Sequence, residues 1–230
     1  MLNERIKDLK KHLIDYGSLV EKMLQITTKG LLDKNKSLLE DVINIKEPIA
    51  NNYEIEFDEI CANTIAQYQP VSKNLRTIIS IIKMSNDLER MADHCVNIAE
   101  YSLSLIKEPD IKQLIDLPKM AMLTNSMLKD SIQSFVNEDV CLAKEVCLRD
   151  DIIDKLNKII KDDLYVLMKE NGDVIKNALK LIAISGNLER IADLTTNICE
   201  EVIYFSEGFV IKHNSDKSRN EEKNSGSYRK

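Results

Sequence analysis

Two segments of the chain place acidic side chains one helical turn apart. Glu89 and Asp93 are four residues apart, and Glu189 and Asp193 have the same spacing. Residues with this spacing share one face of an α-helix, where two like charges repel each other by about 0.2–0.5 kcal/mol. Oxygen ligands from paired carboxylates suit hard cations such as Mg²⁺, Ca²⁺, Mn²⁺ or iron. Each pair could therefore supply half of a cation site, provided that a neighbouring helix supplies further ligands.

The two acidic pairs belong to an internal repeat. LERMADHCVNIAE at 88–100 recurs as LERIADLTTNICE at 188–200, with identical residues at eight of the thirteen positions. Apolar residues upstream keep the same frame, as in Leu75 with Ile175. The two copies are 100 residues apart. This period is too long for a solenoid repeat, so it indicates a duplicated helical bundle.

The elements that position these residues are predicted to be helices throughout. The sequence has few Gly (6), few Pro (4) and few aromatic residues (5%), which disfavours strand-rich folds and glycine-loop nucleotide folds. Apolar residues recur at three- and four-residue spacing between the breakers. A proline is tolerated only in the first turn of a helix, so Pro48 should kink or restart the second helix. The expected helices are about 3–31, 36–68, 71–107, 119–136, 139–169 and 173–207.

This pattern predicts an all-α fold of two tandem, pseudo-symmetric three-helix bundles. The first bundle is expected over residues 1–108 and the second over 109–213. The segment 214–230 has almost no apolar residues, so it cannot offset the entropy of ordering and is expected to be disordered.

Composition excludes several classes of function. The chain of 230 residues carries 32 Lys and Arg against 38 Asp and Glu, a net charge of −6, which disfavours nucleic-acid binding through phosphates. Its five cysteines contain no C-x-x-C pair, so neither a disulfide framework nor a thiolate zinc site is expected. No apolar run approaches the length of a membrane span. We therefore expect a cytosolic protein without direct membrane insertion.

Two interpretations of the acidic stripes compete. They could be solvated faces whose repetition is inherited from the duplication, or they could be half-sites for cations. The second interpretation needs acidic partners, and Glu47, Asn51 and Glu54 share one face of the second predicted helix. The fifth predicted helix offers Asp150, Asp151 and Asp154. No catalytic constellation accompanies either set.

The repeated segments resemble the signature of the PhoU family, the accessory and regulatory proteins of phosphate transport. The resemblance extends over nearly the whole chain to about residue 213. It includes YGSLVEKM at 16–23, QPVSKNLR at 69–76 and RDDIID at 149–154. One departure is Asn74, where the family usually has Asp.

The resemblance implies multinuclear metal sites, most commonly of iron, with Mn, Mg, Ca or Zn as alternatives. Asn51 is a neutral ligand, which predicts weaker metal binding in the first half than in the second. Carried over position by position, the ligands would be Glu89, Asp93, Glu189 and Asp193, with Glu47, Asn51, Asp150 and Asp154 from the partner helices.

The resemblance also implies a non-enzymatic, homodimeric regulator of phosphate uptake and of the phosphate-starvation response. Its expected partners are the ATPase subunit of a phosphate ABC transporter and a sensor histidine kinase. Negative modulation of both would occur by contact, not by catalysis. The alternative is a phosphohydrolase that uses paired metals about 3.5–4 Å apart, and a third possibility is a scaffold whose acidic stripes are inert.

Overall fold

The computed structural model describes residues 1–207. The predicted tail at 214–230 lies outside the described residues, as do positions 208–213 of the predicted second bundle. In the first half, helix α1 covers Leu2–Leu32 and is followed by the short helix α2 (Lys36–Asp41). A π-helical turn at Val42–Lys46 then leads into α3 (Glu47–Tyr68), and α4 covers Ser72–Leu105.

The second half repeats this order of long helices. Helix α5 covers Asp116–Asn137, and α6 covers Val140–Glu170. A 3₁₀ turn at Gly172–Val174 precedes α7, which covers Ile175–Glu207. All regular elements within 1–207 are helical, which confirms the predicted all-α class.

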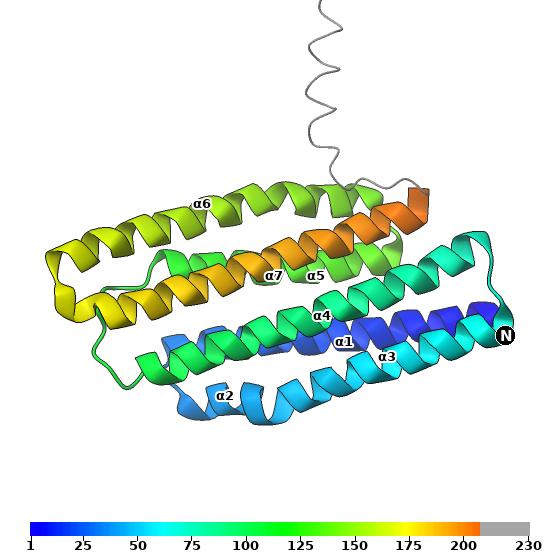
Figure 1. Ribbon diagram of the computed structural model, residues 1–230. Coiled ribbons are helices and arrows are strands. Elements are labelled where there is room, and N and C mark those ends of the chain that lie inside the picture. Colours follow the sequence, from blue (N-terminus) through cyan, green and yellow to red (C-terminus); the bar gives the residue numbers. More distant parts are fainter. Residues whose placement is uncertain (208–230) are drawn as a thin grey trace, which may run out of the picture.

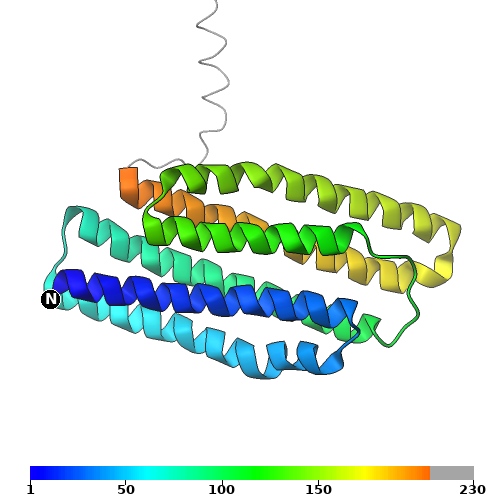
Figure 2. The ribbon, with the colours of Figure 1, turned by 180° about the vertical axis from the view of Figure 1, so that it is seen from behind.

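The halves lie side by side as two layers of three long helices (Figures 1 and 2). Helices α4 and α7, which carry the repeated segments, run along each other, and α1 packs against α5. The remaining long helices, α3 and α6, lie at opposite outer edges of the molecule (Figure 1). This arrangement confirms the predicted pair of pseudo-symmetric bundles and leaves one face of each outer helix without a neighbour in the described chain.

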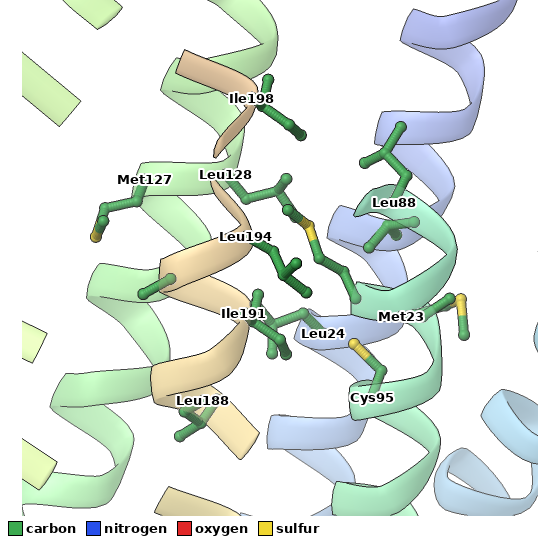
Figure 3. Close-up of a cluster of buried hydrophobic side chains, with 14 of the residues drawn as sticks. Met23, Leu24, Leu88, Cys95, Met127, Leu128, Leu188, Ile191, Leu194 and Ile198 are labelled. Atoms are coloured by element: carbon green, nitrogen blue, oxygen red, sulfur yellow. The ribbon is translucent and has the colours of Figure 1, made fainter. Parts of the chain in front are cut away.

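The apolar core continues from one half into the other. Figure 3 shows Leu24 of α1 and Leu88 of α4 facing Leu128 of α5 and Ile191 of α7. All four side chains are buried. Burying one such side chain stabilises a fold by about 1.5–3 kcal/mol. The halves are therefore joined by a shared core.

The second predicted helix, 36–68, is interrupted just before Pro48, as predicted from this proline. Pro48 lies in the first turn of α3, where its missing N–H breaks no helical hydrogen bond. Just before it, the N–H of Glu47 donates to the carbonyl of Val42, a five-residue step typical of a π-helix. Near the middle of the chain, α5 begins at Asp116, earlier than the predicted 119, because Pro118 also fits within a first turn.

Ion pairs connect the halves at their surface and within the core. Glu138, at the turn between α5 and α6, accepts hydrogen bonds from Lys10 at 2.7 Å and Lys73 at 2.8 Å. These hydrogen bonds lower the pKa of Glu138. Deeper in, the buried Glu201 of α7 accepts from Ser80 Oγ at 3.0 Å and from Lys83 Nζ at 2.9 Å.

Replacing Glu138 by Gln should remove the contribution of its two lysine contacts to stability. All three side chains are partly exposed, so we expect a loss of about 1 kcal/mol at pH 7. A lowered pKa stabilises the fold above the unfolded-state value near 4.5, and this stabilisation is lost as pH falls through the folded-state pKa. Urea unfolding of Glu138→Gln at pH 7 and near pH 3.5 would measure it, with the exposed Glu59→Gln as control. An equal difference at both pH values would contradict this explanation.

Candidate functional site

The acidic stripes lie on α4 and α7, and each faces the outer helix of its own half. Asp93 and Asp193 are both exposed, and Glu89 and Glu189 are half-buried. Their positions follow from the helical period. Leu88 and Leu188 turn into the shared core, so the acidic residues that follow them turn toward α3 and α6.

In the second half the structure brings four of the predicted carboxylates into one cluster, which we call the C-cluster: Asp150, Asp154, Glu189 and Asp193. Burial raises the pKa of Asp150 to about 6, and the charges of Asp193 and Asp154 add to this effect. Burial, followed by the charge of Glu189, also raises the pKa values of Asp154 and Asp193. This set is electrostatically strained when all its members are ionised.

The side-chain amide of Asn157 forms a hydrogen bond with one member of the C-cluster, Glu189. The buried Asn157 donates from Nδ2 to Glu189 Oε2 at 2.6 Å, while its Oδ1 accepts from Ser185 Oγ at 2.9 Å. This chain fixes the rotamer of Glu189. Lys161 Nζ approaches the same glutamate oxygen at 4.0 Å. In contrast, Asp150 Oδ1 is buried and accepts no hydrogen bond from residues 1–207.

In the first half the corresponding cluster, the N-cluster, consists of Glu54, Glu89 and Asp93. Burial raises the pKa of Glu89 to about 7, and the charges of Asp93 and Glu54 raise it further. A side-chain hydrogen bond between Glu89 and Asp93 contributes to the same shift. Two carboxylates can form such a bond only when one of them holds a proton.

Tyr16 of α1 lies beneath the N-cluster. Its ring is fully buried and stacks on Tyr53 at a centroid distance of 4.9 Å. Burial raises its pKa, and the charges of Glu89 and Glu54 add to the shift. The phenolic oxygen has no hydrogen-bond partner within the described part of the chain. The N-cluster is therefore bordered on one side by a polar atom available for a further contact.

Of the eight predicted ligands, six lie in these two clusters, and the charges that raise the pKa of Glu89 do not include that of Glu47. Asn51 is exposed, and Glu47 occupies the first turn of α3. The α3 carboxylate that acts on Glu89 is Glu54, which the sequence placed on the same face but did not count among the ligands.

Sequence reasoning also missed Asn157. The signal that could have found it is the offset of 103 residues that relates α3 to α6. At this offset Glu54 corresponds to Asn157, and the buried Phe57 corresponds to the buried Ile160. The two clusters therefore differ at this supporting position. The N-cluster has the carboxyl group of Glu54 where the C-cluster has the side-chain amide of Asn157.

Neither cluster has the arrangement of a preformed metal site. Within residues 1–207, no group of three or more His, Cys, Asp or Glu side chains is placed to hold a metal ion. A cavity of about 550 Å³ lies elsewhere, where the connection 106–114 meets the ends of α1 and α4 and the start of α7. None of the helices in the described chain is long and apolar enough to cross a bilayer.

Two tandem helical repeats with an acidic stripe on each define the class of the protein, a duplicated PhoU domain. The model of this domain matches residues 13–102 and again residues 117–202. The chain therefore belongs to the PhoU family.

Relatives and solved structures agree with this assignment. Over 212 residues the chain is 34% identical to the phosphate-specific transport system accessory protein PhoU homolog 2 of Thermotoga maritima, covering 92% of this chain and 90% of the relative. The Aquifex aeolicus homologue is 34% identical over 220 residues, covering 96% and 99%. The crystal structure of PhoU from Pseudomonas aeruginosa superposes with a TM-score of 0.87 at 30% identity, covering 91% of this chain and 100% of that one.

A Streptococcus pneumoniae structure, described as the phosphate transport system regulatory protein PhoU, gives a TM-score of 0.85 at 29% identity. It covers 92% of this chain and all of its own. The protein is thus a phosphate transport accessory protein homologue from a family of regulators that are not enzymes. The predicted absence of catalysis is confirmed by this membership, and the phosphohydrolase alternative is wrong.

Replacing Glu89 by Gln should stabilise the metal-free protein above neutral pH. A carboxyl whose folded-state pKa is raised from about 4.5 to about 7 destabilises the fold as pH rises through that window. In a chelating buffer we expect the variant to melt on the order of 2 °C higher than wild type at pH 8 and within error of it at pH 5. Glu59→Gln, an exposed change on α3, is the control. A variant that melts lower at pH 8 would show that ionised Glu89 supports the fold.

Proposed function

We propose that the protein is a cytoplasmic negative regulator of phosphate uptake and of phosphate-starvation signalling. The observation that carries this proposal is the match to PhoU accessory proteins over more than nine-tenths of the chain. The proposed partners are the ATPase subunit of a phosphate ABC transporter and a sensor histidine kinase. The proposed working form is a homodimer.

The geometry suits regulation by contact. Two bundles with a common core offer long outer faces on α3 and α6. A regulator that exchanges partners must bind them with different affinities in its different states. The acidic clusters provide a means of changing state, because the raised pKa values of Glu89 and Asp150 make their charge sensitive to protons near neutral pH.

We further propose that both clusters bind metal ions, with iron as the leading candidate from the family resemblance. In the second half the candidates are Asp150, Asp154, Glu189 and Asp193, because the charges of the other three act on Asp150, which also retains a buried oxygen without a hydrogen-bond partner in residues 1–207. In the first half, Glu54, Glu89 and Asp93 would hold the ion, with Glu47 and Asn51 as further candidates by family pattern. A bound cation would neutralise the repulsion among the carboxylates, and Asn157 would hold Glu189 in place.

Isosteric neutral substitutions should separate the two metal sites. We expect the double variant Glu189→Gln/Asp193→Asn to lose most of the metal that co-purifies with the second half. The variant Glu89→Gln/Asp93→Asn should lose the metal of the first half. Elemental analysis of the purified protein measures both, and Asp58→Asn/Glu59→Gln, an exposed pair on α3, is the control. Unchanged metal content in both double variants would refute the carboxylate sites.

The partner proposal predicts what the tagged protein captures in cells. Affinity purification from phosphate-replete and phosphate-starved cells, followed by mass spectrometry, should recover the transporter ATPase and the histidine kinase. Their ratio should differ between the two conditions, because regulation requires affinities that depend on state. A tagged, unrelated helical protein from the same cells controls for non-specific capture. Failure to recover either partner in both conditions would contradict the proposed function.

A further inference from the structure

Helix α6 carries an exposed apolar stripe on its outer face. Leu148, Ile152, Ile159 and Val166 are exposed to 76%, 46%, 46% and 56% of their full areas. Their spacing of four, seven and seven residues places all four within about 40° around the helix axis, along roughly 27 Å of its length. In the described chain, α6 packs against α5, α7 and the 3₁₀ turn before α7, and it forms one edge of the molecule (Figure 1). The stripe therefore faces away from the bundle.

The stripe is not a general feature of the repeat. At the offset of 103 residues that relates α3 to α6, its members correspond to Ile45, Ile49, Glu56 and Asn63. The first half is thus polar where the second half has Ile159 and Val166. Fold maintenance alone does not explain the difference, because both sets lie on outer faces. A continuous apolar stripe on the edge of a protein marks a contact surface.

The charges along one edge of the stripe identify a partner. Asp151, Lys158, Asp162 and Lys169 are exposed and share one side of it. If a second α6 packs antiparallel about a two-fold axis at Ile159, Asp151 comes within two residues of the position opposite Lys169 and Lys158 within two residues of the position opposite Asp162, each pair occurring twice. A parallel arrangement in the same register would place each charge opposite its own copy. The antiparallel direction therefore brings together four pairs of opposite charge against one approach of like charges, that of Lys158 to its own copy.

The apolar residues fit the same axis. Ile159 meets its own copy at the two-fold axis, and Ile152 meets Val166 on either side. Lys155 lies at the margin of the stripe, from which its long side chain can carry the ammonium group to the rim. Such an isologous contact closes at two copies and does not propagate into a filament.

We propose that the apolar stripe of α6 is a homodimer surface, on which α6 of a second copy packs antiparallel about Ile159. This inference rests on the homodimer of the proposed function and is independent of its transporter and kinase partners. It is also independent of metal binding, since Asp150 and Asp154 face α7 and not the stripe. A single helix pair of this length is at the small end of specific interfaces, so the dimer should dissociate in the micromolar range.

Charge reversal with rescue tests the surface. Analytical ultracentrifugation of the full chain up to about 200 µM should show a dimer that Lys158→Glu or Asp162→Lys weakens by about tenfold each. The double variant Lys158→Glu/Asp162→Lys should restore wild-type affinity, because both pairs become opposite in sign again. Ile159→Glu should give a monomer with unchanged helical content by circular dichroism. Met122→Glu, at an exposed position of α5, is the matched control and should leave the dimer intact.

Disulfide trapping tests the direction of packing. In a Cys141→Ser background, which removes an exposed native thiol, Ile152→Cys and Val166→Cys chains are purified with different tags. Oxidation of the mixture should yield the disulfide between the two chains far faster than either chain couples to itself. Preferential coupling of like chains would overturn the antiparallel arrangement.

Two further outcomes would overturn the proposal in different ways. A dimer that survives Ile159→Glu would refute this surface while leaving homodimerisation intact. A wild-type protein that remains monomeric to about 200 µM would refute both this surface and homodimerisation, and the stripe would then have to bind another partner. Neither result bears on the recovery of the transporter ATPase or the kinase from cells.

Discussion

The structure depends on the burial of α4 against α7. Each of these helices completes the core of its own half and also supplies half of the core between them, as Leu88 and Ile191 do in Figure 3. A three-helix unit that left such a face in water would expose a large apolar area. Each repeat therefore covers apolar surface that the other would expose by itself.

This shared core determines where the acidic residues lie. A helix buried along one stripe can carry charge only on the remaining arc, and on α4 and α7 that arc faces α3 and α6. The carboxylates are consequently confined between helices, and partial burial there raises the pKa values of Glu89, Asp150, Asp154 and Asp193. Glu201 of α7 is buried at the boundary between the halves, where it accepts hydrogen bonds from Ser80 and Lys83 of α4.

The sequence predicts the helices and the repeat well, because both depend on local pattern. The period of apolar residues identifies each long helix, and Pro48 marks the interruption of one. The pairing of Glu89 with Asp93 follows from spacing within one helix. The choice of Glu54 over Glu47 does not, because the two share one face of α3 and only the position of α3 along α4 decides which of them lies beside Glu89. The buried amide of Asn157 also escapes a search for charged ligands, although its role is to position one.

The π-helical turn at Val42–Lys46 has a consequence for the tolerance of this region to changes in chain length. A single widened turn holds one residue more than the α-helical path needs, and here the five-residue step runs from Val42 to Glu47. Losing one residue from this turn would restore the ordinary four-residue step and would leave the helical phase on both sides unchanged. The corresponding part of α6 is continuous α-helix and has no such spare residue, so the same deletion there would rotate everything beyond it by about 100°. The two halves share one architecture, yet only the first can shorten its outer helix without turning its acidic face away from α4.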